Sequence, residues 1–519
     1  MRISQVLVFW LVLLVGFRCT SAQSGHASDS PIVFRIDTSI TYQTMHNFGA
    51  SDAWSIQNIG TDWPVEVRER VAELLFSTEN DRGGQPKGVG LTAWRFNIGA
   101  GSAEQGKESG IRSDWRRAEC FMDSAGDYDW SKQAGQQWFL KEAAKYEVED
   151  VIAFVNSPPV YFTKNNKAWS EDGLSSNLKP EYYKDYADFL VTVVKGLESN
   201  TGVKIDYLSP FNEPQWEWKC CKQEGTPWNN DELAKVTRFI DLAFTENDVT
   251  HTKIEITENA QIDFLYEVKS PTQRSNQLEE FFTKDSDNSL LNLNHLAPKI
   301  CGHSYFSTWD KKRLVESRIK FWNKLQSINP ELEYWATEYC LLEDNEEVVG
   351  PGKDLGIDPA LYNARVIHTD LVFANSSTWQ WWLAVSVGDY KDGLVYLDPD
   401  DKLKVEDSKL MWALGNYSRF IRPGSIRINI ESDDERYDSR NLVGPMVSSF
   451  LTPEGEIIVV MINEEDANQS IKLEGFESQL DINLYTTAEG QGENLKPSVA
   501  SSKSSIILPA RSVVTCVIH

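Results

Sequence analysis

The most informative segment of this 519-residue chain is residues 205–214, which read IDYLSPFNEP. Its first half is rich in β-branched, aliphatic and aromatic residues, the composition of a buried strand. Pro214 follows directly after Asn212 and Glu213, and a proline cannot donate a hydrogen bond to a strand ladder. The segment therefore predicts a short buried strand that ends in an amide and a carboxylate side chain.

Similar apolar segments alternate with longer amphipathic segments over most of the chain. In residues 180–197 and 231–244 the apolar residues recur at steps of three and four, which predicts helices. The eight predicted strands are residues 47–50, 91–98, 151–156, 205–212, 254–258, 299–305, 333–338 and 378–384. Eight strands that alternate with helices predict an α/β fold of the (β/α)8 TIM-barrel type.

The pattern changes after Pro423, where short alternating segments are separated by Asp, Glu, Gly and Asn. These segments predict a fused C-terminal β-sandwich, with strands at residues 426–430, 457–462, 482–485, 504–508 and 512–518. Residues 31–44 alternate in the same way and are expected to add a strand to it. The predicted organisation is a signal peptide at 1–22, an N-terminal sandwich segment at 23–45, a barrel at 46–415 and a sandwich domain at 416–519.

The first 22 residues have the layout of a secretory signal peptide, with a basic start at Arg2, an apolar run and a small-residue exit at Ala22. We therefore expect cleavage near Ala22 and secretion to an extracellular or periplasmic compartment, with no membrane partner. The chain carries 51 Lys and Arg against 77 Asp and Glu, a formal net charge of −26. A field of that sign repels phosphate backbones, so nucleic acid is excluded as a partner and neutral ligands fit better.

Metal and cofactor chemistry has little support in the sequence. The seven histidines are scattered and form no HExxH motif. Cys220 and Cys221 are adjacent, whereas zinc-binding cysteines are usually separated by about two to four residues. The sequence also contains no nucleophile-elbow, P-loop or dinucleotide motif. We expect no cofactor and no metal, and a chain that acts as a monomer. The pairing of its cysteines is left open.

Two predicted strands end in a carboxylate, Glu213 after the fourth strand and Glu338 at the end of the seventh. In a parallel barrel catalytic groups project from the carboxyl ends of strands, so these two groups are expected to face each other across the mouth. Most enzymes that cleave glycosidic bonds use a pair of carboxyl side chains that flank the bond. Glu213 is the predicted acid/base and Glu338 the nucleophile, with Tyr305 and Arg95 placed to keep Glu338 charged.

Other carboxylates compete for these roles. Glu258 closes the fifth predicted strand and is the chief rival, although a supporting or substrate-binding role suits it better. Glu217 and Glu343 are weaker rivals because they lie beyond the strand ends. A protein that binds carbohydrate without cleaving it is the alternative of a different class.

Aromatic side chains cluster at the same rim, where they would stack on the apolar face of a sugar. The candidates are Trp54, Trp169, Trp216, Trp218, Trp309 and Trp382, of which Trp382 is the favoured floor of the sugar site. Asn212 is expected to bind a sugar hydroxyl. His303 is expected either to face the cleft or to be a hydrogen-bonded core residue.

These residues resemble family 30 glycoside hydrolases of clan A. The resemblance rests on residues 47–51 (NFGAS), 94–99 (WRFNIG), 156–159 (NSPP, beginning with Asn156), 211–214 (FNEP) and Glu338, and on the junction 420–424 (FIRPG). It implies a barrel with a fused β-sandwich, an acid/base after the fourth strand, a nucleophile after the seventh, retention of anomeric configuration and no metal.

The resemblance also suggests a substrate. Residues 223–226 (QEGT) are similar to the branch that acts on β-1,6-linked galactan, which implies a secreted endo-β-1,6-galactanase. The alternatives within the family are β-1,6-glucanase, xylanase, β-xylosidase and glucosylceramidase activity. The chain departs from many members at residues 50–54 (ASDAW, with Asp52 and Trp54) and at 159–161 (PVY), and both departures alter the subsite for the non-reducing sugar.

Overall fold

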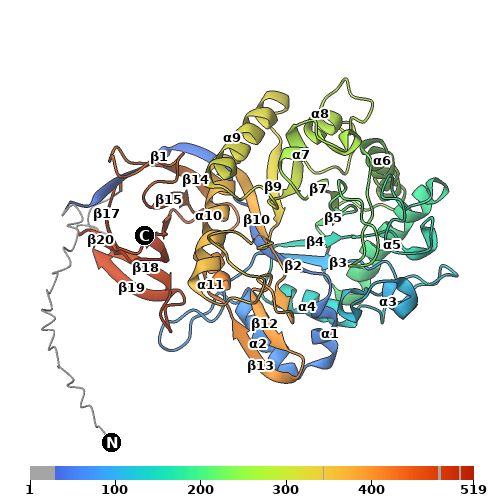
Figure 1. The fold of residues 1–519 in the computed structure, drawn as a ribbon, viewed down its shortest axis with the longest axis horizontal. Helices are drawn as coiled ribbons and strands as arrows, with labels where there is room; N and C mark the ends of the chain where they lie inside the picture. Colours follow the sequence, from blue (N-terminus) through green and yellow to red (C-terminus); the bar gives the residue numbers. More distant parts are fainter. Residues whose placement is uncertain (1–29, 343, 477–480, 502–503) are drawn as a thin grey trace, which may run out of the picture.

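A computed structural model describes residues 30–342, 344–476, 481–501 and 504–519 of the chain. The predicted signal peptide at 1–22 and the rival carboxylate Glu343 lie outside the described residues. Two bodies are packed side by side, a barrel with surrounding helices and a smaller β-sandwich (Figure 1). Among the described residues, no helix combines the length and the apolar character that a membrane crossing requires.

The barrel is a curled parallel sheet with the strand order β6-β5-β4-β3-β2-β10-β9-β8-β7. Each of the eight predicted strands has a counterpart in this sheet. The strands are β2 (Asn47–Asp52), β3 (Ala93–Asn97), β4 (Asp150–Phe154), β5 (Tyr207–Ser209), β6 (Lys253–Ile254), β7 (Thr257–Asn259), β8 (Lys299–His303), β9 (Glu333–Glu338) and β10 (Ser376–Trp382). The prediction of an α/β barrel with a β-sandwich is confirmed.

The fifth predicted strand, 254–258, is divided into β6 and β7 by Glu255 and Ile256. This break is also where the barrel closes. The N–H of Glu255 donates to the carbonyl of Leu208 in β5, and the carbonyl of Ile256 accepts from the N–H of Cys301 in β8. The two ends of the sheet are therefore joined through one short segment.

Helices cover the outside of the sheet. They are α1 (Ser55–Asp62), α2 (Val65–Phe76), α3 (Ser102–Gln105), α4 (Ala134–Lys145), α5 (Tyr183–Thr201), α6 (Asn230–Glu246), α7 (Asp263–Tyr266), α8 (Gln277–Phe282), α9 (Lys311–Ile328), α10 (Ile357–Phe373) and α11 (Lys409–Ser418). The two predicted helices correspond to α5 and α6. Helix α6 begins with a capping box in which Asn229 and Glu232 satisfy free N–H groups of the first turn.

A small antiparallel hairpin extends the loop after β10. It comprises β12 (Val395–Asp398) and β13 (Asp401–Asp407), and β11 (Val385–Ser386) pairs with β12 in parallel. This small sheet was not predicted from the sequence. It matters for function because the segment between β11 and β12 reaches the mouth of the barrel.

The sandwich is built from both ends of the chain. It comprises β1 (Ile32–Thr44), β14 (Ile426–Glu431), β15 (Met446–Leu451), β16 (Ile457–Asn463), β17 (Gln469–Glu474), β18 (Asp481–Ala488), β19 (Lys496–Ser501), β20 (Ile506–Leu508) and β21 (Ser512–Ile518). Strand β1 pairs with β14 in antiparallel and with β17 in parallel orientation. The predicted strand at 31–44 therefore lies in the sandwich, whereas β15, β17 and β19 were missed.

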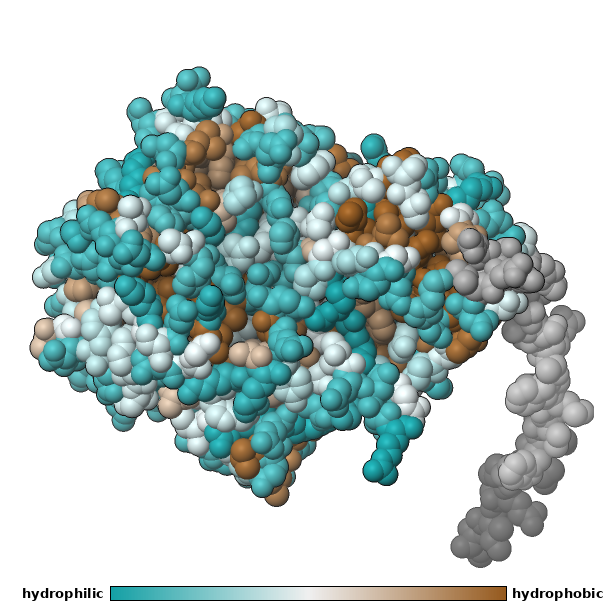
Figure 2. Space-filling view, turned by 180° about the vertical axis from the view of Figure 1, so that it is seen from behind, coloured by the Kyte–Doolittle hydropathy of each residue, from teal (hydrophilic) through white to brown (hydrophobic). Residues whose placement is uncertain are grey.

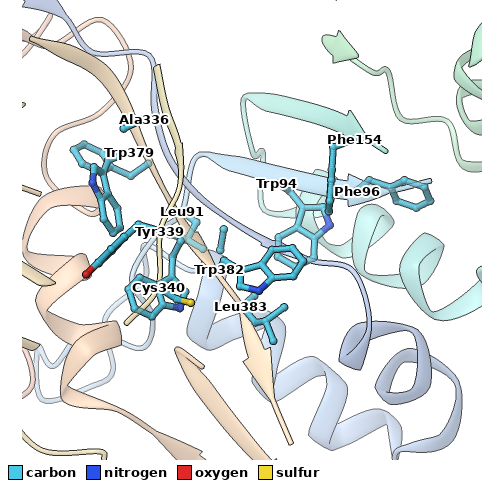
Figure 3. Close-up of a cluster of buried hydrophobic side chains, with 14 of the residues drawn as sticks. Leu91, Trp94, Phe96, Phe154, Ala336, Tyr339, Cys340, Trp379, Trp382 and Leu383 are labelled. Atoms are coloured by element: carbon cyan, nitrogen blue, oxygen red, sulfur yellow. The ribbon is translucent and has the colours of Figure 1, made fainter. Parts of the chain in front are cut away.

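The barrel core is aromatic. Trp94 and Phe96 from β3, Phe154 from β4 and Trp382 from β10 belong to one cluster of buried side chains (Figure 3). Phe154 and Trp382 meet edge to face with their ring centroids 6.1 Å apart. This cluster connects the core directly to the residues at the mouth.

We predict that Phe34→Ala destabilises the sandwich strongly. Phe34 is fully buried in β1 and meets Tyr437 edge to face at 4.9 Å. Loss of such a ring typically lowers the free energy of unfolding by about 3–5 kcal/mol. Ile40→Ala is the matched control, since Ile40 lies on the same strand but is 45% exposed. Urea unfolding of both variants tests this, and equal effects would show that β1 is not anchored by its buried face.

Candidate active site

Glu213 and Glu338 meet at the mouth of the barrel. Glu338 is the last residue of β9, and Glu213 lies in the loop that follows β5. Both line one cavity of about 480 Å³. One carboxylate oxygen of each lies with a ring nitrogen of His303 in a group whose atoms are all within 4.8 Å of one another. The two carboxylates that the sequence analysis paired are therefore brought together.

The backbone at Glu213 is held in an unusual conformation. Its φ is 44°, and that of Glu258 is 60°, in the left-handed region that non-glycine residues seldom adopt. The N–H of Glu213 donates to the carbonyl of Glu258 at 2.8 Å, and Trp218 Nε1 donates to the carbonyl of Glu213 at 2.9 Å. Such conformations cluster at functional sites, where neighbouring contacts hold them.

Glu338 is surrounded by hydrogen-bond donors. Arg95 Nη1 donates to Glu338 Oε2 at 2.8 Å, and the Tyr305 hydroxyl donates to Oε1 at 3.1 Å. These two donors fix the orientation of the carboxylate, one at each of its oxygens. Both contacts match the arrangement expected from the sequence.

Glu258 is fully buried beneath these two groups. Its Oε2 accepts from Arg95 Nη2 at 3.3 Å, from His303 Nε2 at 2.8 Å and from the Thr337 hydroxyl at 2.7 Å. Burial alone would raise the pKa of Glu258, but the charge of Arg95 and the hydrogen bonds from His303 and Thr337 outweigh it and lower the pKa to about 2. Glu258 is therefore a permanent anion that supports the site.

His303 links the three carboxylates. Its Nδ1 lies 3.2 Å from Glu213 Oε1 and 3.6 Å from Glu338 Oε1, and its Nε2 faces Glu258. Burial disfavours the charged ring, but the carboxylates of Glu338, Glu213 and Glu258 prevail and raise the pKa of His303 to about 10. The ring is an imidazolium at neutral pH, so both of its nitrogens donate.

Glu213 differs from its partners. Its burial raises the pKa of the Glu213 carboxyl, and the charges of Glu338 and Glu258 act in the same direction, whereas His303 opposes them. The result is a carboxyl group that holds its proton more strongly than an exposed one. Glu213 and Glu338 therefore have different surroundings, since Glu213 faces His303 while Glu338 accepts hydrogen bonds from Arg95 and Tyr305.

Two clusters have the composition of a cation site, Glu213 with His303 and Glu338, and Glu255 with Glu258 and Cys301. In the first, both nitrogens of His303 already face carboxylates. In the second, the ammonium of Lys299 lies 2.9 Å from Glu255 Oε2. Arg95, His303 and Lys299 thus supply positive charge where a metal would have to bind.

Several other predicted residues line the cavity. They are Trp54, Asn212, Trp216, Trp218, Tyr305 and Trp382. Trp54 and Trp382 meet edge to face at 5.0 Å and form an aromatic corner of the cavity. A cavity with aromatic walls and a few polar groups suits a sugar ring.

The remaining predicted residues lie outside the cavity lining. Asn156 is buried, and Trp169 donates its Nε1–H to the carbonyl of Ser109. Asp52 is buried and accepts from the N–H groups of Trp54 and Ile56. Asp52 therefore orders the turn that carries Trp54 and does not itself face the cavity.

Much of the cavity wall comes from loop residues that were not predicted from the sequence. The missed residues are Arg116, Lys222, Gly388, Tyr390 and Asp392, together with Phe306, Cys340 and Leu342, which follow strand ends. Gln223 was quoted only for its likeness to a family motif. Phe306, Cys340 and Leu342 lie within four residues of the end of a predicted strand. That position was the signal from which a place in the cavity wall could have been predicted. The loop residues follow no periodic pattern that would identify them.

One wall of the cavity is carried by residues 216–223, which contain Trp216, Trp218, Lys222 and Gln223. Cys220 and Cys221 form a disulfide within this loop. The side chains of Cys120, Cys301, Cys340 and Cys516 are buried.

The barrel and the sandwich each match a protein-family model. Residues 31–396 match the model of O-glycosyl hydrolase family 30, and residues 424–516 match the model of the family 30 β-sandwich domain. A crystal structure of a conserved exported protein from Bacteroides fragilis is 36% identical, with a TM-score of 0.88 over 93% of this chain and all of that chain.

Two curated relatives have described activities. An endo-β-1,6-galactanase from Hypocrea rufa is 20% identical over 409 residues, which cover 75% of this chain and 76% of that protein. An exo-β-1,6-galactobiohydrolase from Bifidobacterium longum is 34% identical over 212 residues, which cover 34% of this chain and 13% of that protein. The catalytic domain of xylanase C from Talaromyces cellulolyticus, 22% identical with a TM-score of 0.66 over 94% of this chain and 100% of that domain, shares the fold. Because the first family model alone spans residues 31–396, the protein belongs to glycoside hydrolase family 30.

Proposed function

We propose that this glycosidase retains anomeric configuration, with Glu338 as nucleophile and Glu213 as acid/base. The observation that carries the proposal is the short distance between the two carboxylates, whose nearest oxygens lie within 4.8 Å. Retaining enzymes place their carboxyl groups about 5–5.5 Å apart, whereas inverting enzymes need about 6.5–9.5 Å to admit a water molecule.

In the first step, an oxygen of Glu338 attacks the anomeric carbon and the glycosidic C–O bond breaks. The proton of Glu213 passes to the departing oxygen, which leaves a glycosyl ester on Glu338. His303 Nδ1 donates to Glu213 Oε1, so the transferable proton is on Oε2, the oxygen that His303 does not face. Arg95 and Tyr305 orient Glu338 for the attack.

In the second step, Glu213 acts as a base. It takes a proton from a water molecule whose oxygen attacks the anomeric carbon, and the bond to Glu338 breaks. His303 now stabilises the ionised form of Glu213, since its positive charge is 3.2 Å away. The same imidazolium therefore serves both steps without losing its proton.

We further propose β-1,6-linked galactan as the substrate and internal bonds as the point of cleavage. The support is the likeness to an endo-β-1,6-galactanase over 75% of the chain, together with the higher local identity to an exo-β-1,6-galactobiohydrolase. The aromatic corner of Trp54 and Trp382 is suited to a pyranose ring. Secretion remains part of this proposal, supported by the pattern of residues 1–22 and by the likeness to an exported protein.

We predict that the protein releases new reducing ends from β-1,6-galactan faster than from β-1,6-glucan or xylan. Internal cleavage would yield a range of oligosaccharides at early times, and NMR of the first product would show the β-anomer. Product sizing and NMR test these points separately. Preferential release from xylan or glucan would contradict the substrate, and an initial α-anomer would contradict the mechanism.

We predict that Glu338→Gln lowers kcat by about 10⁴-fold or more, since removal of a nucleophile has effects of this order. Glu213→Gln should cost about 10²–10⁴-fold on polysaccharide and much less on an aryl glycoside whose leaving group needs no proton. Glu217→Gln is the matched control, because this exposed residue of the same loop pairs with Lys219 outside the cavity lining. Steady-state kinetics on variants that are shown to be folded test both roles. Unchanged activity in either variant would reject the role assigned to that residue.

We predict that His303→Asn moves the alkaline limb of the pH–rate profile to higher pH. His303 lowers the pKa of Glu213, so removal of its charge should let Glu213 keep its proton longer. The shift is upward because a close positive charge that favours the ionised carboxylate is removed. The profile of kcat/KM for an aryl galactoside measures it, and a limb that stays fixed or moves to lower pH would contradict the role of His303.

A further inference from the structure

A second cavity lies between the barrel and the sandwich. Its volume is also about 480 Å³, and its lining comes from β1, the end of α10, β14, β15 and the segment 432–440. Helix α10 ends just before β10 begins at Ser376, whereas Trp382 at the other end of β10 lines the active site. The seven residues of β10 span roughly 20 Å, so this junction cleft lies toward the opposite end of the barrel from the active site.

Two polar groups in the junction cleft have unmet hydrogen-bonding capacity. His368 Nδ1 and the Ser448 hydroxyl are buried and have no hydrogen-bond partner within the described parts of the chain. Both side chains belong to residues that are only 2% exposed. The great majority of buried polar atoms in proteins are paired, so His368 and Ser448 give the lining of the cleft hydrogen-bonding capacity that the described parts of the chain do not use.

The rim of the junction cleft carries an ordered aromatic ring. Tyr42 is 42% exposed, and its hydroxyl donates to Asn429 Oδ1 at 3.0 Å. The guanidinium of Arg427 lies 3.7 Å from the ring centroid and is itself held by Gln43 and Asn375. An immobilised tyrosine beside polar groups can pack on the C–H face of a sugar at little cost in conformational entropy.

The charges around the junction cleft balance. Arg427 and Arg440 line it, and so do Glu431 and Asp438. Arg427 already has its own partners, so it does not present a free positive charge. This balance favours a neutral ligand over a phosphate or a uronic acid.

We propose that the junction cleft is an accessory binding site for a neutral saccharide, separate from the active site. It would hold one segment of a branched or aggregated polysaccharide while the barrel mouth cleaves another. The choice of galactan as the probe rests on the proposed function, but the site itself rests on the residues of the cleft.

The test uses full-length protein in which Glu338→Gln prevents hydrolysis. Binding of polymeric β-1,6-galactan is measured by titration calorimetry for this protein alone and with Tyr42→Ala or Ser448→Val added. Ile40→Ala is the control, since Ile40 is exposed on the same strand and does not line the cleft. Thermal unfolding verifies that each variant is folded.

Each cleft variant is expected to raise the Kd for galactan at least about fivefold, the effect of losing one good contact. The control should leave it unchanged. With Glu338 restored, cleft variants should hydrolyse an aryl galactoside normally. An unchanged Kd in both cleft variants would overturn the site, and competition by inorganic phosphate would assign it to an anion and overturn it as well.

The outcomes for the active site and for the junction cleft can be told apart. If wild-type protein hydrolyses galactan but the cleft variants bind it normally, the proposed activity stands and the accessory site does not. If wild-type protein hydrolyses no polysaccharide but the cleft variants lose affinity for galactan, the accessory site stands and the proposed activity fails.

Discussion

The carboxylate of Glu258 bridges Arg95 and His303 under the barrel mouth, and the charge balance of the active site depends on this bridge. Two cations, Arg95 and His303, face the anions Glu258 and Glu338. A neutral Glu213 then leaves the group without net charge. Buried charges are costly unless they are paired and hydrogen-bonded, so this arrangement favours a proton on Glu213 in the resting site.

The barrel brings these groups together from distant parts of the chain. Arg95 comes from β3, Glu258 from β7, His303 from β8 and Glu338 from β9. A parallel sheet aligns the carboxyl ends of its strands, so short side chains from different strands reach one point. The helices and the aromatic core hold the strands in register (Figures 1 and 3). The outer surface is largely hydrophilic, with a hydrophobic patch over the sandwich half in the view from behind (Figure 2).

Residues at strand ends were the most predictable part of the site. A predicted strand has a clear sequence pattern, and in a parallel barrel the functional side chains lie at the carboxyl ends of the strands. This is why the sequence pointed to Glu213, Glu338, Tyr305 and Arg95. Glu258 was recognised only as a rival, since its partners come from other strands. Residues such as Arg116 and Asp392 follow no periodicity, and only tertiary packing brings them to the cavity. The role of His303 was left open, because a histidine on a strand gives the same sequence pattern whether it is a core residue or lines a functional site.

The fold was predictable for similar reasons, and its failures have physical causes. Strand β15 has two serines at its centre, and β19 contains a proline at the edge of its sheet, so neither reads as a regular apolar strand. The break between β6 and β7 falls inside residues 254–258 (IEITE), which alternate like a single strand. Sequence periodicity reports the burial of each residue, but it does not report where the backbone must bend to close a barrel.

The pairing of β1 with β14 and β17 has a consequence for biosynthesis. Strand β1 leaves the ribosome before the barrel, whereas its two neighbours emerge only after it. Its apolar face, with Ile32, Phe34 and Ile36, must wait unpaired while hundreds of residues are translated. An unpaired strand with an apolar face is prone to aggregate, so the chain is most exposed to aggregation through this segment before β14 and β17 have been made.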